Sequence, residues 1–145
     1  MLYFIRLPYS HLVQQKLAAE SHKTDAITAH VLDTSKGTPV AGIKIHLLQE
    51  ISIGDNDSRW KTVSETVTNL DGRSLGLAPV DHGCESIISV GVFKLIFETE
   101  PYFAASSIST FYPRVEVIFR ITDPKSHYHI PLLISPFGYS TYRGS

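Results

Sequence analysis

In the stretch Arg114-Val-Glu-Val-Ile-Phe-Arg-Ile121, every second residue is apolar. One face of an extended chain would carry the four apolar side chains of Val115, Val117, Phe119 and Ile121. The other face would carry the charged side chains of Arg114, Glu116 and Arg120. Since successive side chains of a strand point to opposite faces, this period of two predicts a β-strand with one buried face and one solvated face.

The same period of two recurs along the chain from Ala26 onward. Besides residues 114–121, the expected strands are 27–33, 43–48, 60–67, 91–97, 127–134 and 137–142. The last of these is expected to be an edge strand, which invites pairing with another subunit.

Turn and loop residues separate the strands. Asn69–Gly72 predicts a tight turn in which Gly72 takes a positive φ angle. Asp123–Ser126 predicts a hairpin loop, and residues 49–58 and 75–90 predict longer loops.

One short helix is expected among the strands. Thr99 is the predicted N-cap and Pro101 lies in the first turn, so the helix should begin there and end near Ser107. Seven to eight short strands with one short helix predict an all-β fold, an antiparallel β-sandwich, formed as a single domain by residues 26–145.

Composition excludes several classes of protein. The formal net charge of −1 gives no basic surface, so a nucleic-acid partner is not expected. No apolar run reaches the roughly 18 residues needed to cross a bilayer, so no membrane segment is expected either. The single cysteine, Cys84, excludes an intrachain disulfide and suits a reducing compartment.

Residues 1–25 differ from the rest and are expected to form a flexible or targeting extension. The apolar run Met1–Ile5 is too short for the core of a signal peptide, so secretion is not expected. Arg6-Leu7 and His11-Leu12 resemble the paired residues of the N-terminal peroxisomal signal, but the pairs lie closer together than in that signal. A peroxisomal and a cytoplasmic location therefore both stay open.

Histidines are the first candidates for chemistry. His30 interrupts an apolar strand, and His127 and His129 lie two apart on another, so the last two point to one face about 6–7 Å apart. Such a pair could bind zinc or copper, could be two solvated side chains, or could include a general base. No Asp, Glu or Cys adjoins the pair to complete a set of ligands, so no metal is expected.

Two further features have both a structural and a functional interpretation. Arg73 directly follows the turn at Asp71-Gly72, where it could be a surface residue or could hold a carbonyl-rich substrate or an anion with its planar guanidinium. Tyr142-Arg-Gly-Ser145 follows the last strand, and its final carboxylate would lie near the end of that strand. Both a structural and a site role are open for this segment.

Five motifs together resemble the transthyretin-like 5-hydroxyisourate hydrolases over residues 26–145. They are Ile27–Asp33, Thr68–Arg73, Phe111–Pro113, His129–Pro136 and Tyr139–Ser145. The resemblance implies a transthyretin-like sandwich that hydrolyses 5-hydroxyisourate to 2-oxo-4-hydroxy-4-carboxy-5-ureidoimidazoline by ring opening, in urate degradation and without a cofactor. It also implies a homotetramer, a dimer of dimers, with the sites in a channel between the dimers.

The resemblance also assigns roles to residues. His30, Arg73, His129 and Ser145 match the family's catalytic positions, and His30, Arg73 and Tyr142 its substrate-binding positions. Of the histidine pair, His129 matches the family's catalytic histidine, which directly precedes Ile-Pro-Leu-Leu. Either His129 or His30 is expected to be the general base.

Two other functions remain to be separated from this one. A transthyretin-like carrier of small ligands would share the fold and the tetramer but would not need His30, Arg73, His129 or the segment Tyr142–Ser145. An interaction module with incidental histidines is the third interpretation. The rate at which 5-hydroxyisourate decays in the presence of the protein distinguishes these three interpretations.

Overall fold

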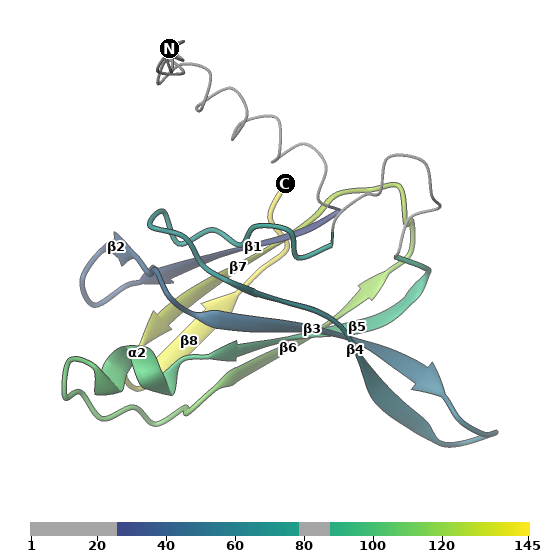
Figure 1. The fold of residues 1–145 in the computed structure, drawn as a ribbon, viewed down its shortest axis with the longest axis horizontal. Helices are drawn as coiled ribbons and strands as arrows, with labels where there is room; N and C mark the ends of the chain where they lie inside the picture. Colours follow the sequence, from purple (N-terminus) through teal and green to yellow (C-terminus); the bar gives the residue numbers. More distant parts are fainter. Residues whose placement is uncertain (1–25, 79–87) are drawn as a thin grey trace, which may run out of the picture.

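The computed structural model describes residues 26–78 and 88–145, which form two four-stranded sheets packed face to face (Figure 1). One sheet has the strand order β2-β1-β7-β8, and the other has the order β4-β3-β5-β6. The strands are β1 (Ile27–Asp33), β2 (Thr38–Pro39), β3 (Lys44–Ser52), β4 (Ser58–Val67), β5 (Gly91–Glu98), β6 (Val115–Ile121), β7 (Tyr128–Ser135) and β8 (Gly138–Thr141). The predicted all-β sandwich is confirmed. The predicted extension 1–25 and residues 79–87 of the predicted loop 75–90 lie outside the described residues.

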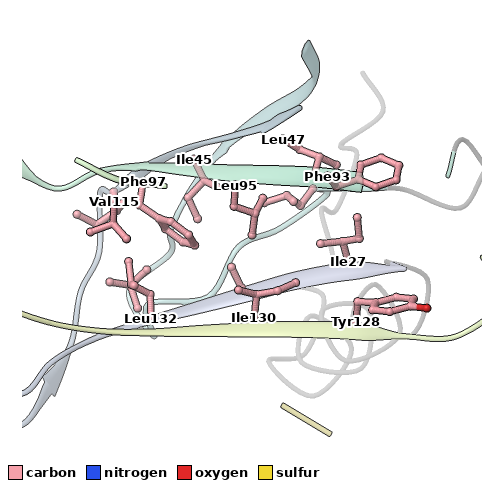
Figure 2. Packing of buried hydrophobic residues seen from close by; sticks show 14 of the residues in the cluster. Ile27, Ile45, Leu47, Phe93, Leu95, Phe97, Val115, Tyr128, Ile130 and Leu132 are labelled. Carbon is pink, nitrogen blue, oxygen red and sulfur yellow. The ribbon is translucent and has the colours of Figure 1, made fainter. Parts of the chain in front are cut away.

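The core lies between the sheets and is built from the apolar faces that the period of two predicts (Figure 2). Along β1, burial alternates as predicted, with Ile27, Ala29 and Val31 inside and Thr28 and His30 half-buried on the outer face. The facing sheet contributes fully buried side chains that include Ile45, Leu47, Phe93, Leu95 and Phe97. Because full burial of such a side chain is worth about 1.5–3 kcal/mol, the core fixes the register of β1 and leaves its outer face to polar residues.

One pair of strands departs from the predicted antiparallel arrangement. β1 and β7 run parallel, in a register that extends from Ile27 opposite Tyr128 to Asp33 opposite Ile134. The remaining pairs among the described strands are antiparallel. A period of two is the same for both directions, so the sequence pattern alone could not reveal this pairing.

Two predicted loops are wrong in detail. β3 and β4 continue into the predicted loop 49–58, and Ser52 pairs with Ser58. This end of the hairpin extends away from the rest of the sandwich (Figure 1). Its side chains therefore do not alternate between buried and exposed, although the two backbones remain paired. Asp123–Ser126 does not form a hairpin loop, because β6 and β7 belong to different sheets and the segment crosses between them.

The predicted helix is present but shorter than expected. The helix α2 (Glu100–Ala104) has five residues, with a proline in its first turn. Thr99 occupies the N-cap position, but its hydroxyl donates to the carbonyl oxygen of Tyr112 (3.1 Å) instead of capping the helix. Ser107, the predicted end, lies beyond the helix with a positive φ of 54°. No helix in the described ranges is long and apolar enough to cross a bilayer.

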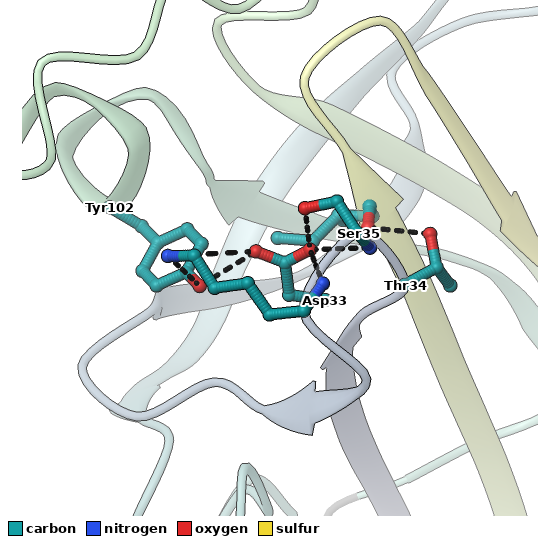
Figure 3. Close-up of polar contacts among 6 residues, drawn as sticks. Asp33, Thr34, Ser35 and Tyr102 are labelled. Carbon is teal, nitrogen blue, oxygen red and sulfur yellow. Dashed lines mark hydrogen bonds and ion pairs between the residues drawn. The ribbon is translucent and has the colours of Figure 1, made fainter.

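A buried carboxylate connects the end of β1 to α2 (Figure 3). Asp33 is fully buried, and its oxygens accept hydrogen bonds from the backbone amide and the hydroxyl of Ser35 and from the hydroxyl of Tyr102 (2.8, 2.6 and 2.8 Å). Burial alone would raise the pKa of Asp33, but the hydrogen bonds from Ser35 and Tyr102 outweigh it and lower that pKa. This corner fixes the end of the strand that carries Thr28 and His30.

Candidate active site

The segment at residues 72–74 lies along the part of the β1 edge that β2 leaves unpaired, and it places Arg73 beside His30. The amide of Val31 donates to the carbonyl oxygen of Gly72 (2.8 Å), and the amide of Ser74 donates to that of Ala29 (3.0 Å). His30 and Arg73 therefore form a non-hydrogen-bonded antiparallel pair, in which Cα atoms are about 4.5 Å apart and the side chains share a face.

Gly72 makes this close approach possible. It has a φ of +72°, and a Cβ atom at this position would collide with the carbonyl oxygen of Val31. The turn before it is closed by Asn69, whose backbone oxygen accepts from the amide of Gly72 and whose side-chain oxygen accepts from that of Arg73 (both 2.9 Å). The predicted tight turn is confirmed, and its effect is to present the Arg73 side chain to solvent on the outer face.

The parallel pairing of β1 with β7 brings the second histidine to the same face. Thr28 lies opposite His129, and its Oγ1 is 2.9 Å from Nδ1 of His129 and 3.1 Å from Nε2 of His127. The two imidazole rings lie 6.4 Å apart between centroids with an interplanar angle of 13°. Thr28 therefore holds Nδ1 of His129, so Nε2 is the ring nitrogen left for a substrate.

The segment after β8 returns to β7 and passes over His129. The amide of Gly144 donates to the carbonyl oxygen of His129 (2.9 Å). A Cβ atom on Gly144 would collide with Cδ2 of the His129 ring, so only glycine allows this approach. Arg143 is anchored alongside, with its Cζ 5.2 Å from the centre of the Tyr128 ring.

An open cavity of about 470 Å³ lies where these elements meet. Its lining contains Thr28, Ala29, Arg73, Ser74, His127, His129 and Ser145. The structure thus brings together three of the predicted catalytic residues: Arg73, His129 and Ser145. His30 lines an adjoining hollow with Leu32, Pro39 and Asp71, and Arg73 borders both spaces.

Tyr142, the remaining predicted residue, is not in this cavity. It is 60% exposed and lines a second hollow of about 420 Å³ together with β6 residues, Tyr128 and Arg143, and His129 borders both this hollow and the cavity. Within one chain, Tyr142 therefore does not share the space of Arg73 and Ser145.

Both site histidines favour the neutral form. Burial, followed by the charge of Arg73, lowers the pKa of His30, and contacts with Asp71 only partly oppose this. Burial also lowers the pKa of His129, helped by the charges of Arg73, His127 and His30. A neutral imidazole beside a permanent cation is suited to accept a proton at neutral pH, while the guanidinium can hold developing negative charge.

Sequence reasoning missed Thr28 and Ser74. Ser74 accepts from the amide of Ala29 with its Oγ (2.7 Å) and thereby secures the 72–74 segment. A signal for Thr28 was available: it lies two residues before His30 and so faces the same side of the strand. Its partners could not be found, because they depend on the parallel register with β7. No three His, Cys, Asp or Glu side chains in residues 26–78 and 88–145 are grouped so as to hold a metal ion.

Comparison with known proteins identifies relatives of this chain. Residues 27–144 match the model of the HIUase/Transthyretin family. The chain is 42% identical over 122 residues to a probable 5-hydroxyisourate hydrolase of Caenorhabditis elegans, covering 84% of this chain and 83% of that protein. The solved structure of Klebsiella pneumoniae 5-hydroxyisourate hydrolase superimposes with a TM-score of 0.63 at 34% identity, covering 82% of this chain and 98% of the other.

A transthyretin structure gives a similar superposition with a lower identity. Transthyretin from Sparus aurata has a TM-score of 0.66 at 26% identity, covering 82% of this chain and 96% of that chain. The fold is thus common to both kinds of protein, and the family model spans nearly the whole described sandwich. This chain belongs to the HIUase/Transthyretin family.

Proposed function

We propose that this protein is a 5-hydroxyisourate hydrolase of urate degradation, which opens the six-membered ring to give 2-oxo-4-hydroxy-4-carboxy-5-ureidoimidazoline. The observation that carries the proposal is the cavity in which Arg73, His129 and Ser145 meet beside His30. The similarity to proteins named as 5-hydroxyisourate hydrolases supports it.

The site supplies groups for the steps that hydrolysis needs. His129, kept neutral by burial and by Arg73, takes a proton from the attacking water on Nε2. Arg73 holds the carbonyl oxygens of the substrate and the negative charge that develops on them. His30, beside Arg73, contacts the substrate from the adjoining hollow, and Ser145 orients the water or a substrate oxygen.

The test follows the ultraviolet decay of freshly generated 5-hydroxyisourate with the purified protein. Wild type should accelerate the decay well above the spontaneous rate. His129→Ala, His30→Ala and Arg73→Glu should each lower kcat/KM by about a hundredfold or more, because each removes an acid–base or oxyanion-stabilising group.

A matched control is available on the other sheet. His46 lies on the outer face of β3, where its Nδ1 is 2.9 Å from Oε1 of Glu65, and it should tolerate replacement by alanine without loss of kcat/KM. Decay at the spontaneous rate with wild type would instead favour a small-ligand carrier. Near-wild-type turnover by one of the three site variants would remove that residue from the mechanism.

The assembly proposed for this function is a homotetramer built from two dimers. β6 and β8 are edge strands of the two sheets, and they expose Ile118 (62%), Tyr139 (43%) and, just beyond β8, Tyr142 (60%). Apolar side chains on unpaired edges favour pairing with a second copy. In such an assembly Tyr142 can contact a substrate in a space shared between subunits. The peroxisome and the cytoplasm remain the two predicted locations.

A further inference from the structure

Thr28 has an unusual position between two imidazoles. Its Oγ1 lies 2.9 Å from Nδ1 of His129 and 3.1 Å from Nε2 of His127, so one hydroxyl is within hydrogen-bond distance of both rings. All three residues line the cavity that contains Arg73 and Ser145. The arrangement forms a hydrogen-bonded chain that leads from the half-buried His129 to the exposed His127.

The chemistry of a hydroxyl group restricts how this chain can be protonated. A hydroxyl has a single proton to donate and two lone pairs that accept. Thr28 can therefore donate to only one of the two imidazoles. If Nε2 of His129 is to act as a base, neutral His129 must carry its proton on Nδ1 and donate it to Thr28. The hydroxyl of Thr28 is then available to donate to Nε2 of His127.

We propose that Thr28 and His127 are positioning residues that form a proton relay behind His129. This proposal rests on the hydrolase function proposed above, in which His129 is the base. Thr28 fixes the tautomer of His129 with Nε2 unprotonated, and His127 receives the positive charge that would otherwise stay on His129.

In the proposed transfer, protons move in one direction, from the attacking water towards His127. Nε2 of His129 takes a proton from the attacking water, and the proton on Nδ1 passes to Oγ1 of Thr28 while the hydroxyl proton of Thr28 passes to Nε2 of His127. His129 ends neutral with its proton on Nε2, Thr28 keeps one proton, and His127 becomes an imidazolium. When Nε2 of His129 then donates to the departing ring nitrogen, the same protons return and restore the starting state.

The two histidines of the hydrogen-bonded chain differ in their exposure to water. His129 is half-buried, and the charges that lower its pKa are those of Arg73, His127 and His30. His127 is exposed, so water can solvate a cation there. Ser145, from the segment that follows β8 and lies over His129, also lines this cavity. The relay therefore moves the positive charge from the half-buried ring of His129 to an exposed ring.

Three variants separate a relay from a structural role. Thr28→Val keeps the shape and the strand preference of threonine but removes the hydroxyl, and it should lower kcat roughly tenfold or more. Thr28→Ser keeps the hydroxyl and should stay within about threefold of wild type. His127→Gln has an amide oxygen that can accept from Thr28 but cannot take a proton, so it should lose kcat like Thr28→Val.

Two kinetic readouts would not respond to a structural defect alone. Imidazole added in solution should restore part of the kcat of His127→Gln but not that of Thr28→Val. The double variant should be no slower than Thr28→Val, because both changes interrupt one chain. Thr62→Val, an exposed threonine on β4, is the matched control and should leave kcat unchanged. Wild-type kcat in Thr28→Val, or effects of the two changes that multiply, would overturn the relay.

A measurement without substrate keeps this test separate from the hydrolase proposal. The ¹⁵N chemical shifts of the imidazoles at high pH report which nitrogen is protonated. His129 should carry its proton on Nδ1 in wild type and in Thr28→Ser, and should lose this preference in Thr28→Val. A proton on Nε2 of His129 in wild type would overturn the relay even if hydrolysis is fast. Absence of hydrolysis with the expected tautomer would overturn the hydrolase proposal and leave the hydrogen-bonded chain established.

Discussion

His129 is the residue at which most of the site's contacts meet. Its Nδ1 lies against Thr28, its carbonyl oxygen accepts from Gly144, and Arg73 lines the same cavity. None of these three contacts comes from a residue next to His129 in the sequence. The chemistry of His129 therefore depends on side chains and backbone groups from three separate segments, and each can be tested by one substitution.

The charge of Arg73 should set the pH range of activity. Burial and Arg73 lower the pKa of His129, so the base stays neutral, and kcat/KM is maintained, down to a pH below the ordinary histidine value of about 6.5. Arg73→Gln removes the positive charge, raises the pKa of His129 and should shift the acid limb of the kcat/KM profile to higher pH. Arg73→Lys, which keeps a positive charge, should leave the limb near its wild-type position. An acid limb that does not move in Arg73→Gln would exclude His129 as the titrating base.

Gly144 should be sensitive to the addition of one methyl group. In Gly144→Ala the new Cβ would meet the His129 ring, so the ring or the backbone must shift, and kcat/KM should fall at least tenfold. Gly54 has open space around its Cα and no left-handed φ, so Gly54→Ala is the control and should keep full activity. Equal kinetics of the two variants would show that the position of His129 does not depend on Gly144.

At the scale of elements, the glycine of the turn before Arg73 has a matched control in the turn between β1 and β2. Gly72 and Gly37 both have left-handed φ angles, +72° and +69°, but only at Gly72 would a Cβ atom meet the backbone of β1. Alanine at either position should cost about 1–2 kcal/mol of the free energy of unfolding for the φ angle. Gly72→Ala should cost more and should also lower kcat/KM, because the segment that carries Arg73 must move away from β1. Urea unfolding and steady-state kinetics of the two variants check this, and equal losses of stability would contradict it.

The buried corner at Asp33 should stabilise the sandwich without taking part in catalysis. Tyr102→Phe removes one hydrogen bond to a buried carboxylate, which is worth about 1.5–3 kcal/mol. The free energy of unfolding should fall by this amount, while kcat/KM at a temperature where the variant is folded should stay near wild type. A large loss of kcat/KM in the folded variant would mean that the corner controls the position of β1 in the site.

The sequence pattern predicted most elements and only part of their arrangement. The period of two identified the faces of β1 and β6, and Asn69–Gly72 identified the turn, because these depend on neighbours in the chain. The length of the β3–β4 hairpin was missed, because its far end is paired but not buried. The same limit applies to the site: residue types pointed to His30, Arg73 and His129. The imidazole partners of Thr28 and the second hollow, which Tyr142 lines, follow only from the pairing of strands distant in the chain.

At the scale of the whole molecule, the exposed edge of β6 should control assembly. Ile118 lies on this edge and is 62% exposed, so Ile118→Lys would place a charge where a second copy is proposed to pair. Light scattering after size-exclusion chromatography should show a smaller assembly than for wild type. Ile53→Lys, at a 52% exposed isoleucine of the β3–β4 hairpin, should keep the wild-type mass. An unchanged mass for Ile118→Lys would place the interface elsewhere.

The parallel pairing of β1 with β7 has a consequence for how activity is lost and regained. Thr28 and His129 face each other although they lie 101 positions apart in the sequence, and most of the remaining strands lie between them. No short segment can therefore assemble the site locally, and its contacts form only when the long-range closure of the sandwich is complete. During refolding, catalytic activity should return with the slowest folding phase. The turnover rate of the enzyme therefore reports whether the entire sandwich has formed.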